Sequence, residues 1–194
     1  MIRNLLNIKL GEFDSLINSA ECGAGGVLTM PFFNGERTPD LPYAKGGIVG
    51  LDSQNVSPAN LLRSGVEGAT FALRFGLEEL NRLEVSTNEL ILTGGGANSA
   101  AWRQIVADVM GVSVNCMLHD EGAAFGAALQ ALAALESLNL GEDSPLLDHI
   151  ALDPTKSCDP DPVANDAYNQ CYKYYQNAVE AFSSLYSQPF AKQQ

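Results

Sequence analysis

The stretch from Ile91 to Gln104, which reads ILTGGGANSAAWRQ, constrains this chain more than any other part of the sequence. Its apolar start predicts a buried strand, Gly94-Gly95-Gly96 predicts a tight turn, and the residues after the turn predict a helix. Three consecutive glycines are unfavourable to order, because glycine loses more conformational freedom on folding than any other residue. A chain accepts them where its backbone must come close to another group. Because a helix start presents free N–H groups and a positive dipole end, this turn suits a phosphate, a ribose or a nucleobase edge.

The elements around this turn alternate between helix and strand. Apolar residues spaced three or four apart predict a long helix from Pro58 to about Leu83, with Ser57 as its N-cap. Strands are expected over 89–93 and 112–116, with a helix between them that ends at Gly111. Such alternation is typical of an α/β layer.

The flanking segments complete the expected order of elements. Two further strands are expected over 27–33 and 48–51, and helices over 121–136 and 164–186. Residues 138–163 are rich in acids and proline and predict a loop. The Pro- and Gly-containing segment 34–47 is a second loop, which either carries internal ion pairs at the surface or lines a cleft.

Two of the expected helices carry faces with almost no side chains. Gly65, Gly68 and Gly76 share one face of the long helix, and Gly122 and Gly126 share one face of the helix over 121–136. Glycine inside a helix costs up to about 1 kcal/mol relative to alanine. We therefore expect another backbone to pack closely against each of these faces.

Composition and charge exclude several classes of function. The chain has 194 residues, of which 46% are apolar, and a net charge of −12 with only eleven Lys and Arg, so we expect a globular protein that binds neither nucleic acid nor an anionic membrane. No apolar run reaches the length of a transmembrane helix. The four cysteines lack C-x-x-C spacing, which favours a reduced, cytoplasmic protein without a structural zinc site. A nucleotide remains compatible with an acidic chain if backbone N–H groups and Mg²⁺ neutralise its phosphates.

The glycine turn matches neither of two common nucleotide motifs. A dinucleotide fingerprint requires G-x-G-x-x-G, but Ser99 stands at the place of the third glycine. The G-x-x-x-x-G-K-[ST] pattern of a P-loop does not occur. From the glycines alone, a tight strand-to-helix turn without any ligand stays an open alternative.

Four stretches together resemble the C-terminal half of carbohydrate kinases of the FGGY family, and most closely the xylulokinases within it. The similarity extends over nearly the whole chain, and the four stretches follow the family's order. They are Gly35-Glu36-Arg37-Thr38-Pro39, Gly46 to Leu51, Gly94 to Ala97 with Ser99 and Trp102-Arg103-Gln104, and Glu121 to Ala128. The resemblance implies an actin-like ATPase fold (sugar kinase/Hsp70/actin) of two ribonuclease-H-like α/β domains, with ATP and a sugar between them. It also implies transfer of the ATP γ-phosphate to a pentulose such as D-xylulose, with the help of Mg²⁺ and an Asp base.

The resemblance assigns the glycine turn to the adenosine of ATP. It implies that the backbone of Gly94, Gly95, Gly96 and Ala97 approaches the nucleotide, and that Asn98 and Ser99 border the base. Residues 1–137 would form the core of the nucleotide-binding domain, 138–163 an acidic loop, and 164–194 a terminal helix on the same domain.

The family's phosphate loops and catalytic Asp precede the region that this chain resembles. We therefore assign no catalytic residue, and we expect this chain alone to be inactive and to require an N-terminal kinase domain. We also expect the domain's first strands to be missing, so that strand 47–51 lacks neighbours and exposed edges are covered by a second chain, by the mate in a homodimer or by a rearrangement.

Other functions stay open from the sequence. They include a nucleotide-binding module without chemistry and a kinase for glycerol, ribulose, gluconate or another polyol. A chaperone-type actin-like ATPase is disfavoured by the G-E-R-T-P loop and by Trp102-Arg103-Gln104.

Overall fold

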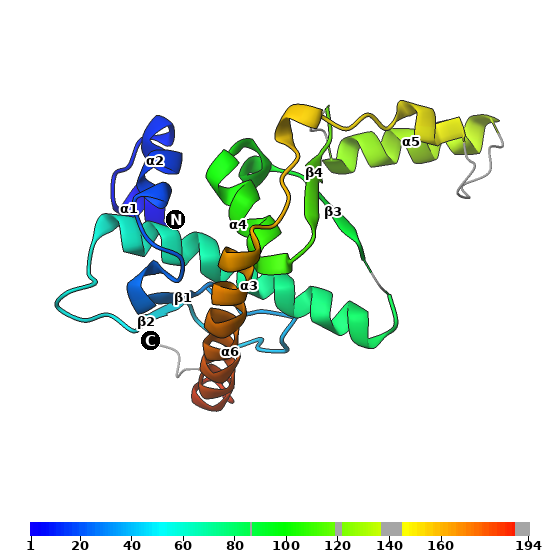
Figure 1. Ribbon diagram of the computed structural model, residues 1–194. Coiled ribbons are helices and arrows are strands. Elements are labelled where there is room, and N and C mark those ends of the chain that lie inside the picture. Colours follow the sequence, from blue (N-terminus) through cyan, green and yellow to red (C-terminus); the bar gives the residue numbers. More distant parts are fainter. Residues whose placement is uncertain (86, 119–121, 137–144, 189–194) are drawn as a thin grey trace.

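The computed structural model describes residues 1–85, 87–118, 122–136 and 145–188 (Figure 1). Its α-helices are α1 (Ile2–Leu5), α2 (Phe13–Asn18), α3 (Pro58–Arg82), α4 (Ala100–Met110), α5 (Gly122–Glu136) and α6 (Pro162–Leu185). Its strands are β1 (Leu28–Met30), β2 (Gly47–Val49), β3 (Glu89–Leu92) and β4 (Ser113–Cys116). Short 3₁₀ turns lie at Leu10–Glu12, Ala24–Gly26, Gly95–Asn98, Pro145–His149 and Pro154–Lys156. The mixed α/β architecture expected from the alternation is confirmed.

The described strands form two separate pairs. β1 and β2 are antiparallel, with Leu28 opposite Val49, whereas β3 and β4 are parallel, with Glu89 opposite Ser113. Parallel strands require a crossover connection, and α4 provides it between β3 and β4. The expectation that strand 47–51 lacks neighbours is wrong, because β1 pairs with it.

Both strands of the antiparallel pair are shorter than expected. β1 ends at Met30 because Pro31, which follows it, has no N–H to donate. β2 ends at Val49, and Gly50 then adopts the left-handed region at φ +80°. An ideal Cβ on Gly50 would lie 2.1 Å from the Gly26 carbonyl oxygen, so glycine is required at this turn.

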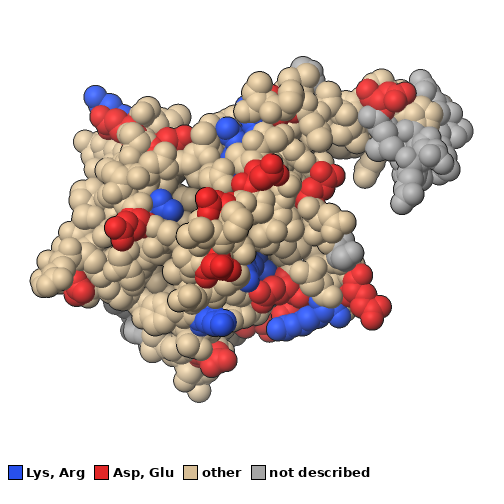
Figure 2. Space-filling model, in the orientation of Figure 1, with Lys and Arg blue, Asp and Glu red and all other residues tan. Residues whose placement is uncertain are grey.

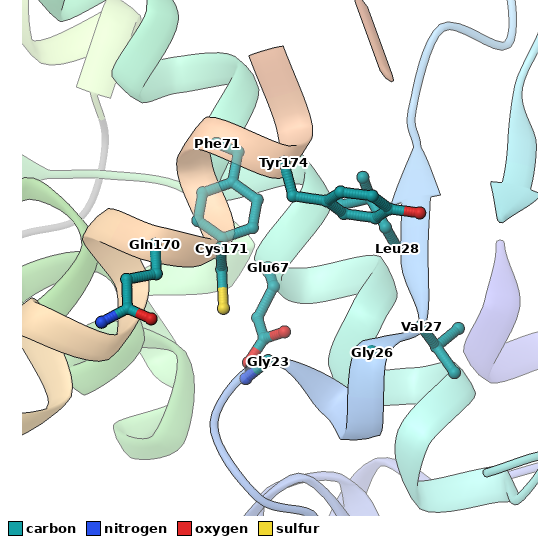
Figure 3. A pocket seen from close by; sticks show the side chains of 9 residues that line it. All are labelled: Gly23, Gly26, Val27, Leu28, Glu67, Phe71, Gln170, Cys171 and Tyr174. Atoms are coloured by element: carbon teal, nitrogen blue, oxygen red, sulfur yellow. Dashed lines mark hydrogen bonds between the residues drawn. The ribbon is translucent and has the colours of Figure 1, made fainter. Parts of the chain in front are cut away.

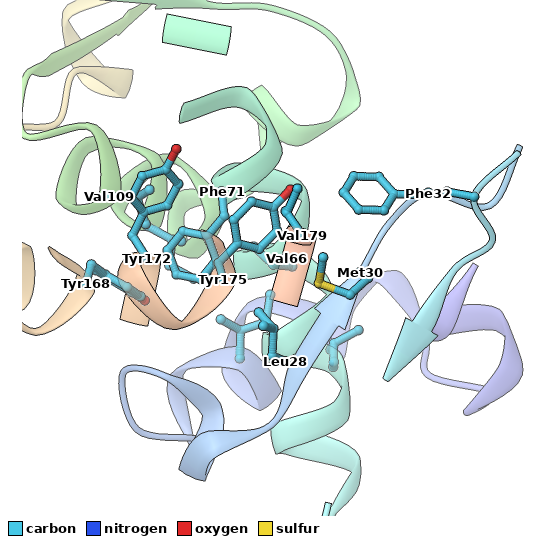
Figure 4. Close-up of a cluster of buried hydrophobic side chains, with 14 of the residues drawn as sticks. Leu28, Met30, Phe32, Val66, Phe71, Val109, Tyr168, Tyr172, Tyr175 and Val179 are labelled. Atoms are coloured by element: carbon cyan, nitrogen blue, oxygen red, sulfur yellow. The ribbon is translucent and has the colours of Figure 1, made fainter. Parts of the chain in front are cut away.

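The core lies where α3, α6 and β1 meet (Figure 4). Aromatic rings from α6 surround Phe71 of α3, whose ring centroid lies 5.5 Å from that of Tyr175 and 6.0 Å from that of Tyr168. Leu28 and Met30 of β1 pack against the same cluster. The aromatic stripe of the last helix is therefore a packing surface, as its helical spacing predicts.

The small-residue face of α3 has the expected role at Gly68 but not at Gly76. An ideal Cβ on Gly68 would lie 1.9 Å from the Thr29 carbonyl oxygen, so β1 approaches the helix backbone there. The corresponding position on Gly76 meets nothing within 4 Å. The same is true of Gly126 on α5, so the prediction of a closely packed backbone is wrong at these two positions for the described residues.

The apolar stripe of α3 is uncovered over its second half. Leu73 is 56% exposed and Leu80 is 47% exposed, although apolar residues at this helical spacing predict a face that packs in the core. They line a groove of about 510 Å³ together with Leu90 and Ile91 of β3, and Ile91 is 50% exposed. Among the described strands β3 pairs only with β4, so its other edge is open, and β3 lines this groove.

α5 and the acidic segment lie beside β4. α5 extends away from the rest of the chain in Figure 1, and most of its described residues are exposed. After it, antiparallel bridges join Met117 to Leu152 and Val114 to Cys158. Residues 152–158 therefore follow β4 and are more ordered than the expected loop. Glu121 and residues 138–144 of the expected elements lie outside the described residues.

Candidate functional site

The glycine turn differs from a direct strand-to-helix turn. Gly94 adopts φ +83°, Gly95–Asn98 form a 3₁₀ turn, and α4 begins only at Ala100. Ser99 is the N-cap, and its Oγ accepts a hydrogen bond from the Trp102 N–H at 3.0 Å.

The N–H groups at the start of α4 are occupied by a carboxylate. Asp14 of α2 accepts hydrogen bonds through Oδ2 from the N–H groups of Ala100 (2.9 Å) and Ala101 (3.4 Å). Its Oδ1 accepts one from Ser99 Oγ at 2.5 Å. The expectation of free N–H groups at this helix start is therefore wrong. An acidic side chain already stands at the position that a phosphate would otherwise favour.

The side chain of Arg103 stabilises the turn by a hydrogen bond to its backbone. This side chain is 8% exposed and donates from Nη1 to the Ala97 carbonyl oxygen at 2.7 Å. Its Nε is buried without a hydrogen-bond partner. The neighbouring indole of Trp102 donates to Thr70 Oγ1 at 3.2 Å. Arg103 therefore stabilises the turn through the Ala97 carbonyl, while Trp102 links α4 to α3.

A cavity of about 630 Å³ opens at this turn. Gly95, Asn98, Ser99 and Trp102 form one wall. The opposite wall comes from the first fourteen residues and consists of Met1, Arg3, Leu10, Gly11, Phe13 and Asp14. This second wall could not be predicted from the sequence, because no motif or spacing links the N-terminal segment to residues about 85 positions away.

The predicted site residues separate into three groups. Gly95, Asn98 and Ser99 line the cavity. Ala97 is buried, and an ideal Cβ on Gly96 would lie 3.3 Å from the Trp102 ring, so these two serve packing. Gly94 provides the left-handed backbone of the turn.

Gly95 is not explained by the packing of the described residues. Its φ lies outside the left-handed region, and an ideal Cβ would meet nothing within 4 Å. A side chain would therefore point into open space in this structure. A glycine at such a position is consistent with a ligand that approaches the backbone closely.

The chemistry of the cavity is mixed. The rings of Phe13 and Trp102, whose centroids lie 6.3 Å apart, provide an apolar part, whereas Asn98, Ser99 and Asp14 provide polar atoms. The volume lies within the range of small-molecule sites. On the face in Figure 2, Asp and Glu side chains are spread among few Lys and Arg, and the described residues form no continuous basic patch there.

The G-E-R-T-P loop borders a separate hollow of about 460 Å³, lined by Asn34 to Arg37, Asp40 and Pro42. Glu36 Oε1 accepts hydrogen bonds from the N–H groups of Arg37 at 2.7 Å and Thr38 at 3.3 Å. No ion pair within this loop occurs in the part of the chain that the structure describes. The alternative of internal ion pairs is therefore not supported.

A third cavity, of about 380 Å³, contains the buried carboxylate of Glu67 (Figure 3). This side chain is 2% exposed, and its Oε1 accepts hydrogen bonds from Arg63 Nε (2.7 Å), the Tyr168 hydroxyl (2.8 Å) and the Gly23 N–H (3.0 Å). Burial raises the pKa of Glu67, while the charge of Arg63 opposes that rise. Because structural partners already engage this carboxylate, the glycine-turn cavity is the better candidate for a ligand site.

The thiol of Cys22, which interacts with Glu67 and Tyr168 of the same cluster, is expected to be unreactive. Burial raises the pKa of Cys22 to about 11 from the ordinary value of 9.0. The thiolate is the reactive form, so at pH 8 we expect alkylation by iodoacetamide to be about 100-fold slower than for an unperturbed cysteine. The rate should rise about tenfold per pH unit up to about pH 11. Peptide mass spectrometry over a time course measures it, and a rate equal to that of free cysteine would contradict the prediction.

The structural comparison defines the class of protein. The structure resembles xylulose kinase from Rhodospirillum rubrum with a TM-score of 0.79 over 96% of this chain at 23% identity. It resembles glycerol kinase from Plasmodium falciparum, solved with ADP, with a TM-score of 0.73 over 93% of this chain at 18% identity. The fold is therefore that of the actin-like sugar kinases, with a ribonuclease-H-like domain, as expected.

The sequence comparison defines the family. The model of the C-terminal domain of the FGGY family of carbohydrate kinases matches residues 7–135. Xylulose kinase from Haemophilus influenzae is 47% identical over 133 residues, which cover 69% of this chain. The chain belongs to the FGGY family of carbohydrate kinases, and the family resemblance is confirmed. It spans 27% of the length of the H. influenzae relative and 38% of the R. rubrum structure.

Proposed function

We propose that this chain is the nucleotide-binding part of a sugar kinase and that the glycine-turn cavity holds the adenosine of ATP. The observation that carries this proposal is Gly95, a glycine that the described packing does not require, at the edge of an open cavity of about 630 Å³. The proposal includes all six residues of the predicted site in two different roles, namely Gly94, Gly95, Gly96, Ala97, Asn98 and Ser99. Gly95, Asn98 and Ser99 contact the nucleoside, and Gly94, Gly96 and Ala97 shape the turn.

Each wall of the cavity suits one part of a nucleoside. The rings of Phe13 and Trp102 offer apolar surface to a flat base. The Asn98 amide has both a donor and an acceptor for the base edge, and Ser99 adds a hydroxyl oxygen. Among the described residues no group of three His, Cys, Asp or Glu side chains could hold a metal ion. Mg²⁺ would therefore arrive bound to the phosphates, where it neutralises their charge.

For the whole protein we propose transfer of the ATP γ-phosphate to a pentulose, D-xylulose, to give xylulose 5-phosphate. The name of the H. influenzae relative supports this substrate, and glycerol, ribulose or gluconate are the alternatives to test beside it. Residues 1–137 would form the nucleotide-binding core, with 138–163 as a connection to a terminal helix over 164–194. We place the protein in the cytoplasm, where its four free cysteines stay reduced. No helix among the described residues is long and apolar enough to cross a membrane.

Catalysis is proposed to require a further part of the protein. The chain spans about a third of its relatives, and we assign none of its residues as the catalytic base. Phosphoryl transfer depends on groups positioned around the γ-phosphate, and the adenosine end of the site supplies none of them. This chain alone should bind nucleotide without turning it over.

Two assays test the proposal. Trp102 is the single tryptophan of the sequence and lines the cavity, so its fluorescence should change on titration with ADP. ATP-dependent phosphorylation of D-xylulose should be absent with this chain alone and should appear when the N-terminal two thirds of a xylulose kinase relative is added. Nucleotide binding without restored activity would favour a non-catalytic module. No fluorescence change with ADP, ATP or adenosine would reject the proposed site.

The groove between α3 and β3 provides the surface for that N-terminal part. A two-stranded parallel sheet with an open edge is marginal alone, and parallel sheets are normally covered on both faces. We expect Ile91→Lys, on the exposed edge of β3, to reduce restored kinase activity by about tenfold or more, because it buries a charge in an apolar contact. Nucleotide binding by the chain alone should not change.

Leu185→Lys is the matched control for this prediction. Leu185 is also exposed, but it lies at the end of α6, outside the residues that line the groove. It should leave restored activity unchanged. Equal effects of the two variants would contradict docking at the groove, and loss of self-association in Ile91→Lys would show that a second copy of the chain covers it instead.

A further inference from the structure

Asp14 brings a negative charge to the start of α4, a place in the cavity that would otherwise attract an anion. α4 has eleven residues, and its first turn presents N–H groups and the positive end of the helix dipole. The Asp14 carboxylate, from the opposite wall, accepts from the N–H groups of Ala100 and Ala101 and from the Ser99 hydroxyl. This helix start is therefore already capped, and a phosphate placed there would face a carboxylate at close range.

The carboxylate keeps hydrogen-bonding capacity for a neutral ligand. Among the described residues Oδ1 accepts one hydrogen bond, from Ser99 Oγ, whereas each carboxylate oxygen has two lone pairs. Asp14 is only half-buried and belongs to the lining of the cavity. A hydroxyl or amino group of a neutral ligand can donate to it, whereas an anion is repelled by its charge and an unprotonated phosphate oxygen has no hydrogen to donate. The arrangement therefore discriminates between the two ends of a nucleotide.

Asp14 also joins the two walls of the cavity. Its element, α2, begins at Phe13, whose ring contacts the ring of Trp102 on α4. The hydrogen bonds of Asp14 to the first residues of α4 and this ring contact act on the same pair of helices. The charge is thus held in a fixed place relative to Ser99 and the glycine turn.

We propose that Asp14 is a specificity-determining residue, which accepts a hydrogen bond from the neutral nucleoside and excludes anionic groups from the start of α4. The proposal rests on the proposed nucleotide site and deepens it, since it sets the direction of the ligand. The nucleoside lies at Asp14, and the phosphates extend away from it. None of the motifs in the sequence points to this residue.

The test replaces the charge but keeps the cap. Asp14→Asn leaves an amide oxygen that can accept from the Ala100 N–H, because Asn is as good an N-terminal cap as Asp. Glu12→Gln is the matched control, an identical change of charge two residues away on a side chain outside the cavity lining. Circular dichroism checks that both variants are folded. Asp14→Ser, which is also neutral and able to cap, is the second variant if Asp14→Asn unfolds.

The probes are adenosine and inorganic phosphate, titrated separately against Trp102 fluorescence and by calorimetry. We expect Asp14→Asn to tighten phosphate binding about tenfold or more, because a unit negative charge is removed at short range. Adenosine binding should weaken several-fold, and Glu12→Gln should change neither. An unchanged phosphate affinity in Asp14→Asn, or an equal gain in Glu12→Gln, would overturn the proposal.

The experiments distinguish a failure of the proposed nucleotide site from a failure of the proposed role of Asp14. If the native chain binds neither ATP nor adenosine, the proposed function fails. The comparison of phosphate binding between the native chain and Asp14→Asn still decides whether Asp14 excludes anions. If the native chain binds adenosine and the variant gains no phosphate affinity, the nucleotide site stands and the role of Asp14 is wrong.

Discussion

Gly95→Leu should weaken ADP binding by about 100-fold or more, which corresponds to about 2.7 kcal/mol, and leave the stability of the chain nearly unchanged. The ideal Cβ at this position meets no atom within 4 Å and the backbone is not left-handed, so the folded chain accommodates a side chain there. The leucine would instead fill part of the cavity that the nucleoside requires. Trp102 fluorescence measures the affinity, and thermal unfolding measures the stability.

Gly76→Leu is the matched control for this experiment. Gly76 also meets nothing within 4 Å, but it lies on α3 beside the apolar groove and outside the glycine-turn cavity. It should leave ADP binding unchanged and, since glycine is about 1 kcal/mol less favourable than alanine in a helix, should not destabilise α3. If Gly95→Leu binds ADP as tightly as Gly76→Leu does, the assignment of the turn is wrong.

Glu67→Gln should cost about 3–5 kcal/mol of the free energy of unfolding, because it leaves the buried guanidinium of Arg63 without its counter-charge. The two side chains are 2% and 11% exposed, and the Arg63 Nε lies 2.7 Å from Glu67 Oε1. Domains of this size are stable by only about 5–15 kcal/mol, so the change is a large part of the total. Urea unfolding followed by circular dichroism measures the difference.

Glu79→Gln is the comparison for this ion pair. Glu79 pairs with Arg82 on the same helix, α3, but both side chains are well exposed. Exposed pairs contribute about 0–1 kcal/mol, so this variant should remain close to the native chain. A loss below about 1 kcal/mol in Glu67→Gln would mean that water or backbone rearrangement compensates the buried charge, and that the cluster in Figure 3 is not an essential part of the core.

Local patterns were sufficient to predict the elements around the glycine turn. α3 begins at Pro58 after a Ser57 cap, and α4 ends at Met110 before Gly111 in the left-handed region, because caps and stops depend on one or two neighbouring residues. Periodicity also identified the aromatic face of α6, where Tyr168 and Tyr175 are buried.

Long-range contacts were beyond these patterns. The capping of α4 by Asp14 joins residues 85 or more positions apart, and a helix start looks free in sequence until its tertiary partner is known. The exposure of Leu73 and Ile91 has a similar origin, since an apolar stripe shows that a face needs cover but not whether the cover belongs to the same chain.

Backbone amide NMR of the uniformly ¹⁵N-labelled chain during an ADP titration shows directly whether a nucleoside binds at the glycine turn. If it does, the largest shift changes should fall on Gly95, Asn98 and Ser99 and on the facing residues Gly11, Phe13 and Asp14. The signals of Gly23 and Gly26, at the cavity around Glu67, should stay in place. Shifts concentrated at Gly23 and Gly26, or no shifts at the glycine turn at saturating ADP, would contradict nucleoside binding at the glycine turn.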